Sequence, residues 1–174
     1  MNTDFYPQRV FRYCPRCGGQ HFEPYGDKAN KCKKCDFVFY FNAATAVAVI
    51  IRDSNGRVLL TRRAFNPGKG MLDLPGGFVD PLESAETAVD REIEEELGLQ
   101  ITSKKYLGSF PNTYLYGGVV YFTTDLVFES SVLSFDTITA KDDVSSYDFY
   151  TITEDVIEQV SATSIKQILR QFCV

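Results

Sequence analysis

The chain has 174 residues, of which 44% are hydrophobic and 24% are charged, and its formal net charge is −5. This composition excludes a disordered chain, and the longest apolar run, residues 46–51, is far shorter than the roughly 18 residues that a membrane-spanning helix needs. The acidic balance argues against a nucleic-acid partner, and the N-terminus has no signal-peptide layout, so we expect a soluble, cytoplasmic protein without membrane contacts.

The charge is distributed unevenly along the chain. Residues 1–41 hold seven basic and four acidic side chains, whereas residues 42–174 hold 11 basic and 19 acidic ones. Such a difference in electrostatic character indicates two modules with separate roles. We therefore predict a small module over 1–41 and one domain of medium size over 42–174.

The small module is dominated by cysteines. Two C-x-x-C pairs, separated by 14 residues, are formed by Cys14, Cys17, Cys32 and Cys35. This spacing is typical of a zinc site, and four thiolates complete a tetrahedral shell, so we predict a structural Zn²⁺ in a module that resembles a zinc ribbon. Two disulfides are the alternative, which a chain without a secretion signal disfavours. We expect His21 on the surface and Cys173 as an unpaired thiol.

The first elements of the larger module are expected to be strands. Residues 44–51 and 57–61 are apolar runs on either side of a turn, and the dipeptide Asn55-Gly56 in that turn predicts a β-hairpin. Residues 62–81 are rich in Gly and Pro, as is typical of a loop.

A helix is expected next, because Ser84 can act as its N-cap and Gly98 can end it. The pattern then becomes β-rich, with strands expected over 101–109, 118–128 and 147–152, and with a last amphipathic helix over 153–172. Strands and helices in this order predict an α/β sandwich with a mixed sheet.

The helix after Ser84 carries an unusual group of carboxylates. At 100° per residue, Glu92, Glu95 and Glu96 share an arc of about 100° at the edge of the apolar stripe, whereas Glu94 points to solvent. Like charges at these spacings cost about 0.2–0.5 kcal/mol per pair, and a divalent cation would reverse the sign of that energy. A solvated acidic face is the alternative, which the position of the arc disfavours.

Residues 77–99 match the signature G-x5-E-x7-R-E-U-x-E-E-x-G-U, with U aliphatic, at every specified position. The segment thus resembles the Nudix hydrolases, and the cysteine module in front of it resembles the zinc ribbon of the NADH pyrophosphatases of that family. The resemblance implies a Nudix α/β/α sandwich. It also implies an enzyme that uses Mg²⁺ or Mn²⁺ to hydrolyse the pyrophosphate bond of a nucleoside diphosphate linked to another group.

The resemblance also assigns roles to residues of the motif. The metal ligands would be Gly77, through its carbonyl, and Glu92, Glu95 and Glu96. The catalytic set would be completed by a structural ion pair, Glu83 with Arg91. A further carboxylate is expected to act as general base, either from Asp136, Asp142 or Asp143 in the loop 134–146, or Glu92 itself. A solvated turn is the alternative for that loop.

The substrate is less well defined by the sequence. After the motif, residues 109–117 keep a Ser and a Phe-Pro of the stretch typical of NADH pyrophosphatases but lack its Gln and Trp. NAD(H)-like dinucleotides and ADP-ribose are the leading substrates. A tyrosine at the position of Tyr116, beyond the motif, resembles the pattern of the diadenosine-polyphosphate subgroup of the family. Phe110, Tyr114 and Tyr116 would either stack on a base or pack within the sheet. Arg62, Arg63 and Lys69 would either contact phosphates or lie solvated.

Two further questions stay open at the level of sequence. A Nudix fold can also serve as a nucleotide sensor or a regulator whose ribbon contacts RNA or another protein, although three clustered glutamates favour an enzyme. The family resemblance also leaves a homodimer open.

Overall fold

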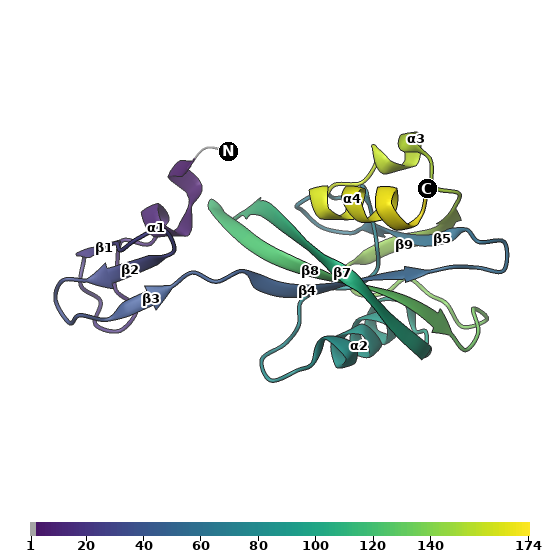
Figure 1. Cartoon of the computed structure of the whole chain (residues 1–174), viewed down its shortest axis with the longest axis horizontal. Helices are drawn as coiled ribbons and strands as arrows, with labels where there is room; N and C mark the ends of the chain where they lie inside the picture. Colours follow the sequence, from purple (N-terminus) through teal and green to yellow (C-terminus); the bar gives the residue numbers. More distant parts are fainter. Residues whose placement is uncertain (1–2) are drawn as a thin grey trace. The chain divides into compact units, whose positions relative to one another are not determined.

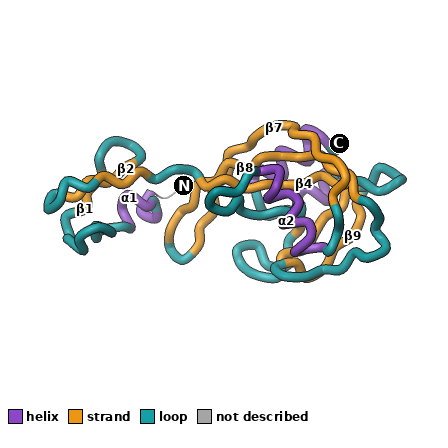
Figure 2. The backbone as a smooth tube through the Cα atoms, turned by 90° about the horizontal axis from the view of Figure 1, so that it is seen from below, coloured by secondary structure: helices purple, strands orange, loops and turns teal. Residues whose placement is uncertain are grey.

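Strand β4 (Ala44–Ile51) organises the larger part of the molecule. In the computed structural model, which describes residues 3–174, β4 is buried from Val47 to Ile51. It runs parallel to β8 (Val119–Val132), and β8 in turn neighbours β7 (Ile101–Tyr116). Glycines with positive φ at 117 and 118 form the tight turn between β7 and β8, so these strands run in opposite directions and the sheet is mixed (Figure 2).

A second sheet is built around β5 (Val58–Arg63). This strand lies between β6 (Leu72–Asp73) and β9 (Val144–Tyr150) and is antiparallel to both. The predicted hairpin of β4 with β5 is therefore wrong, because the two strands belong to different sheets and are joined by a bridge between Arg52 and Val58. The turn at Asn55-Gly56 exists, but it carries the chain from one sheet to the other.

Helices cover both faces of these sheets, as Figure 1 shows. On one face, α2 (Ala85–Leu97) packs on the odd-numbered side chains of β4; this core contains Val47, Val49, Ile51, Val89, Ile93 and Leu97. On the other face, α4 (Thr163–Phe172) packs on the even-numbered ones; this core contains Ala48, Ile50, Leu60, Ile165, Ile168 and Leu169. The predicted α/β/α sandwich is confirmed.

The helix boundaries were predicted with mixed success. Helix α2 begins after Ser84, whose hydroxyl accepts the Thr87 N–H, and it ends at Gly98 in the left-handed conformation, as predicted. The last helix is divided into α3 (Glu154–Ile157) and α4, which corrects the single helix expected over 153–172. The reason is that residues 159–161 pair with β6: the Leu72 N–H donates to the Gln159 carbonyl at 3.0 Å.

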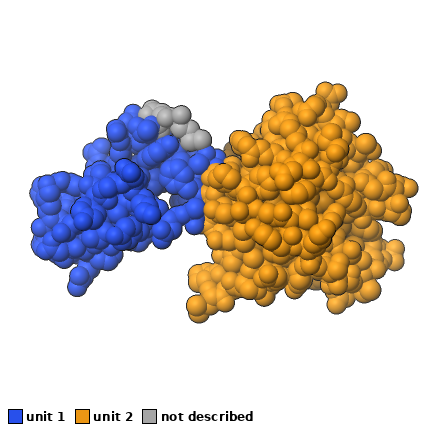
Figure 3. Space-filling view, in the orientation of Figure 1, with its two compact units in different colours: residues 1–43, 113–122 blue, residues 44–112, 123–174 orange. Residues whose placement is uncertain are grey.

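The N-terminal part contains a short 3-10 helix η1 (Thr3–Phe5), helix α1 (Pro7–Val10) and a three-stranded antiparallel sheet. Its strands are β1 (Phe22–Pro24), β2 (Ala29–Cys32) and β3 (Val38–Tyr40). The chain divides into two units, which Figure 3 colours separately: residues up to 43 with 113–122, and residues 44–112 with 123–174. The described residues include no helix with the length and apolar character needed to span a membrane.

Candidate active site and cysteine centre

The loop before α2 lies against β4 through two glycines. The Gly77 carbonyl accepts the Val47 N–H at 2.8 Å, and the Gly76 N–H donates to Glu96 Oε2 at 3.0 Å. A Cβ atom at Gly76 would lie 2.2 Å from the Val47 carbonyl oxygen, and one at Gly77 would lie 2.5 Å from Glu92 Oε1. Glycine at position 76 is therefore required for the close approach to the strand, whereas a side chain at position 77 would displace the Glu92 carboxylate.

Arg91 connects the loop to the helix. Its guanidinium holds Glu83 through two bonds, Nε to Oε1 at 2.9 Å and Nη2 to Oε2 at 2.8 Å, and Nη2 also donates to the Phe78 carbonyl at 2.9 Å. The same group's Nη1 donates to Glu92 Oε1 at 2.9 Å and Glu95 Oε2 at 3.0 Å. The hydrogen bonds from Arg91 lower the pKa of Glu83, and those to Glu83 raise the pKa of Arg91.

Glu96 is the most buried of the three helix glutamates, with 4% of its surface exposed. Burial raises its pKa to about 10, and a hydrogen bond with Asp143 together with the charges of Asp143 and Glu92 adds to the shift. Burial also raises the pKa of Glu92, assisted by the charges of Glu95 and Asp143. The carboxyl groups of Glu92 and Glu96 thus lie in a place where their negative charge is poorly solvated.

These oxygen donors fit a hard divalent cation such as Mg²⁺. Across residues 3–174, the four cysteines form the one group of three or more metal-ligating side chains whose ligand atoms all lie within 4.8 Å. The carboxylate oxygens of Glu92, Glu95 and Glu96 do not all lie within that distance of one another. Arg91 Nη1 lies between the carboxylates of Glu92 and Glu95 and donates to both. A guanidinium nitrogen therefore supplies positive charge at the point where these two carboxylates converge.

The loop after β8 covers the C-terminal end of α2. The Lys141 N–H donates to the Glu96 carbonyl at 2.8 Å, and the Thr139 N–H donates to the Leu97 carbonyl at 3.0 Å. These bonds satisfy carbonyls of the last helical turn that have no partner within the helix. The loop is thereby fixed beside the glutamates.

Of the three aspartates named for this loop, Asp143 is the one whose carboxyl contacts Glu96. Its carbonyl accepts the Ala64 N–H at 2.7 Å, which ties it to the end of β5. Asp142 and Asp143 are both exposed, and Asp142 has a φ of 51°, so the backbone turns between the two neighbours. The Asp136 N–H donates to Ser134 Oγ, so Asp136 lies in a local turn.

The aromatic residues predicted near the substrate separate into two groups. Phe110 packs edge-on against Phe172, with ring centroids 6.2 Å apart, at the border of the α4 core. Tyr114 stacks on Tyr121 across the β7–β8 hairpin at 5.5 Å, and Tyr116 meets the same ring edge-on at 6.4 Å. All three thus make contacts within the fold.

The basic residues before the motif also have intramolecular partners. Arg63 pairs with Asp73 at 2.8 Å, and Arg62 donates to the Gly70 carbonyl at 3.0 Å. Lys69 is exposed. Two of these three side chains are therefore held by the fold.

The four cysteines lie together as free thiols in the N-terminal unit. The Sγ atoms of Cys14 and Cys35 are 3.8 Å apart, and those of Cys17 and Cys32 are 3.6 Å apart. A tetrahedral zinc with Zn–S bonds of about 2.3 Å separates its sulfurs by about 3.8 Å, so the four cysteines fit a zinc site. His21 is exposed and lies outside this group, and Cys173 lies 3.6 Å from Arg52 Nη2.

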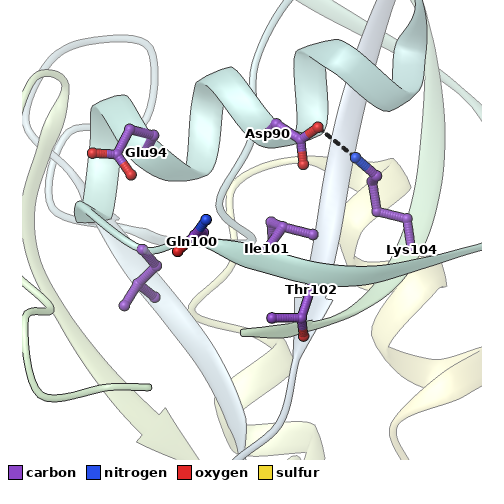
Figure 4. A pocket seen from close by; sticks show the side chains of 7 residues that line it. Asp90, Glu94, Gln100, Ile101, Thr102 and Lys104 are labelled. Carbon is purple, nitrogen blue, oxygen red and sulfur yellow. Dashed lines mark hydrogen bonds and ion pairs between the residues drawn. The ribbon is translucent and has the colours of Figure 1, made fainter. Parts of the chain in front are cut away.

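A hollow of about 380 Å³ lies elsewhere on α2 (Figure 4). It is lined by Asp90, Glu94, Leu99, Gln100, Ile101, Thr102 and Lys104. None of the predicted site residues lines it, and the Lys104 ammonium is already paired with Asp90. We assign it no role.

Comparisons with known proteins agree with the geometry. Residues 42–171 match the NUDIX domain. Among curated relatives, the NAD-capped RNA hydrolase NudC of Vibrio vulnificus is 29% identical over 117 residues, which cover 67% of this chain and 44% of that protein. The chain thus spans less than half the length of the curated relatives that it matches.

Solved structures show the same fold. A NUDIX hydrolase from Nitrosomonas europaea aligns with a TM-score of 0.68 and 22% identity over 94% of this chain and 90% of that one. The NUDIX domain of Shewanella oneidensis NrtR, in a complex with ADP ribose, aligns with a TM-score of 0.60 and 21% identity over 75% of this chain and 86% of that one.

Proposed function

The chain belongs to the Nudix hydrolase family, and from this premise we propose that it is a Mg²⁺-dependent pyrophosphohydrolase acting on a dinucleotide or ADP-ribose-like substrate. The observation that carries the proposal is the carboxylate group of α2. Glu96 and Glu92 meet the Gly76-Gly77 loop at one end of the helix, and Arg91 connects Glu92 to Glu95.

The Mg²⁺ ligands in this proposal are Glu92, Glu95, Glu96 and the Gly77 carbonyl. The bound metal would polarise a phosphoryl oxygen and lower the pKa of a water. Arg91 orients Glu92 and Glu95 and fixes the loop through Glu83, so the ligands are held in place before substrate arrives. This preorganisation lowers the cost of gathering like charges.

Asp143 is the leading candidate for the general base in this proposal. It contacts Glu96 and is fixed to β5 through its backbone, so its carboxylate can accept a proton from a water beside the glutamates. Glu92 is the alternative. We expect Asp143→Asn to lower kcat at saturating Mg²⁺, whereas the neighbouring Asp142→Asn leaves kcat near normal. Normal kcat in both, with loss in Glu92→Gln, would assign the role to Glu92.

The substrate is best identified with a panel. The curated relatives are named for NAD-capped RNA, and one structural neighbour holds ADP ribose, so the panel contains NADH, NAD⁺, ADP-ribose, diadenosine polyphosphates, nucleoside triphosphates and NAD-capped RNA. We expect Mg²⁺-dependent cleavage between the two phosphorus atoms of an NAD- or ADP-ribose-type substrate. Turnover of triphosphates alone would contradict the substrate assignment.

The zinc site and the modular division are also part of the proposal. Cys14, Cys17, Cys32 and Cys35 would hold one structural Zn²⁺ in a module of residues 1–41, and residues 42–174 would form the hydrolase domain. We also propose a cytoplasmic location, and the family resemblance leaves a homodimer open. Binding of ADP-ribose without any turnover of the panel would favour the alternative, a nucleotide-sensing regulator.

A further inference from the structure

The face of the sheet under α4 carries a small polar cluster next to its apolar core. Asp125 of β8 is 6% exposed, and its carboxylate accepts hydrogen bonds from Thr123 Oγ1 at 2.8 Å and Ser164 Oγ at 2.5 Å. Both hydroxyl residues are buried as well. Val127, the next residue of β8 on this face, belongs to the apolar core. A carboxylate at this depth is costly to bury, so its presence calls for a physical reason.

The Asp125 carboxylate has no cationic partner. Within residues 3–174, no Lys, Arg or His nitrogen lies within 4 Å of it, and the Arg63 guanidinium is paired with Asp73 instead. Burial raises the pKa of Asp73, and the charge of Asp125 adds to that shift, so a second carboxyl group lies near the first. The two hydroxyl bonds use two of about four acceptor positions on the Asp125 carboxylate. Acceptor capacity therefore remains for one more hydrogen-bond donor.

Asp125 is the last member of a row of three neighbours across the sheet. Its register partner on β4 is Ala46, and a β-bridge joins Ala46 to Phe78. Register partners point to the same face of a sheet. The residue that follows each of the three packs in the α2 core, so the three side chains themselves lie on the opposite face, the one that α4 covers.

The other end of this row lies beside the glutamate site. The Phe78 carbonyl accepts Arg91 Nη2 at 2.9 Å, and the Phe78 side chain is exposed. Ala46 is half-buried and Ala44 is exposed, so α4 leaves this end of the sheet open. Since neighbouring strands are about 4.8 Å apart, Asp125 lies about 10 Å from the backbone of Phe78. The small Ala46 side chain thus leaves a low floor between the glutamate loop and the buried carboxylate.

We propose that Asp125 selects the substrate by accepting a hydrogen bond from an amino group on its planar ring, either the amine of adenine or the carboxamide of nicotinamide. The inference rests on the proposed function, because it places the diphosphate at the glutamates and a ring on the floor beside them. An amino group donates to the carboxylate, whereas an oxygen in its place is repelled by the negative charge. Thr123 and Ser164 orient the carboxylate for this bond.

A purely structural role for Asp125 is the competing explanation. Helix α4 begins after Ala162, which makes no side-chain cap bond, and a carboxylate near a helix N-terminus stabilises the helix. In that case, loss of the charge would lower stability and would affect every ligand equally. The decisive measurement is therefore the ratio between ligands that differ in one amino group.

The test compares three dinucleotides with the full chain: NAD⁺, its hypoxanthine analogue, in which an oxygen replaces the adenine amine, and its nicotinic acid analogue, in which a carboxylate replaces the carboxamide. kcat/KM is measured with Mg²⁺, and Kd is measured by calorimetry in Glu95→Gln, where turnover is slow. We expect one analogue to be disfavoured roughly tenfold or more relative to NAD⁺ in both measurements, and that analogue identifies the ring at Asp125. In Asp125→Asn, whose amide can donate to an oxygen, the ratio should fall to about threefold or less.

Two further variants serve as a control and as a second test. Ser130→Ala removes a buried hydroxyl from the same strand, but Ser130 is the register partner of Ile51 and faces the α2 core, so the ratio should stay that of the parent. Ser164→Ala keeps the carboxylate and removes one of the two bonds that orient it, so the ratio should fall about threefold. If Asp125→Asn fails to fold, as judged by thermal unfolding, Ser164→Ala decides the question.

Three results would overturn the proposal: equal kcat/KM and Kd for all three dinucleotides in the parent, an unchanged ratio in Asp125→Asn, or an equal loss for all three in that variant. Any of these with Mg²⁺-dependent turnover intact leaves the proposed function standing. Selective binding without turnover would instead contradict the hydrolase and support the role of Asp125. Absence of both binding and turnover would overturn this inference together with the proposed function.

Discussion

The three glutamates of α2 occupy different environments although they belong to one motif. Glu96 is buried and bonded to a backbone N–H, Glu92 is largely buried beside Gly77, and Glu95 has 51% of its side chain exposed. Exposure makes Glu95 the side chain that can be changed with the least cost to folding.

Glu95→Gln is therefore expected to separate catalysis from stability. We predict a fall in kcat of about 10²–10³, the range seen when a group that stabilises developing charge is removed, with little change in Tm. Steady-state kinetics and thermal unfolding measure the two effects. Glu94→Gln, on the solvent-exposed side of α2, is the control and should leave both unchanged. Near-normal kcat in Glu95→Gln would contradict a metal-binding role.

Because the Glu96 carboxyl is buried, we predict that the stability of the metal-free protein depends on pH. Its pKa of about 10 in the folded state lies above the value of about 4.3 in an unfolded chain, so the folded state binds the extra proton and stability falls as pH rises between these values. Glu96→Gln removes that dependence and keeps the hydrogen bond from Gly76. We expect the variant to gain Tm relative to the parent at pH 9 more than at pH 6, without divalent cations.

The control for Glu96→Gln is an exposed glutamate on the same helix. Glu94→Gln removes a charge from the same helix at an exposed position and should leave the parent's pH dependence unchanged. Parallel curves of Tm against pH for Glu96→Gln and the parent would show that the Glu96 carboxyl is not crowded in the folded protein. Added Mg²⁺ should stabilise the parent but not the Glu96 variant.

At the scale of elements, the loop 75–79 lies between β4 and α2 and contacts both. Gly76 allows a close contact with the backbone of β4 that no residue with a Cβ atom tolerates. A Cβ there meets a backbone carbonyl, which cannot rotate away. Gly56 is a suitable control, since it also has positive φ but has open space around it. We predict that Gly76→Ala costs about 1–3 kcal/mol more in unfolding free energy than Gly56→Ala, measured by urea denaturation. Equal costs would mean that the loop can move away from β4.

At the scale of the whole molecule, the tip of the β7–β8 hairpin groups with the cysteine module. Residues 113–122 belong to the same unit as the N-terminal residues, and Tyr6 meets Phe122 edge-on with ring centroids 5.3 Å apart. The hairpin tip is thus part of the small unit although it lies far from it in sequence.

Loss of zinc should therefore affect two separate segments. We expect Cys32→Ser to lose about one zinc per chain and to speed hydrogen exchange in residues 3–43 and in 113–122, while α2 stays protected. Metal analysis and hydrogen exchange with mass spectrometry give the readouts, and Cys173→Ser is the control. Unchanged exchange in both segments would show that they fold without the metal.

Local rules in the sequence were enough for several features. The caps of α2 and the glutamate arc with Glu94 outside it follow from spacing within one helix, and the grouping of the four cysteines follows from two C-x-x-C pairs; the structure has them as predicted. The features of α2 depend on residues within four positions of one another, and the cysteine grouping depends on a spacing that is itself typical of a metal site.

Other features were decided only by the tertiary structure. The turn at Asn55-Gly56 fits a hairpin locally, yet β4 and β5 are apolar on both faces and find backbone partners far along the chain, in β8 and β9. The break before α4 and the choice of Asp143 among three aspartates likewise depend on contacts with β6, β5 and Glu96. Long-range pairing and burial involve residues that no local pattern joins, so the fold alone determines them.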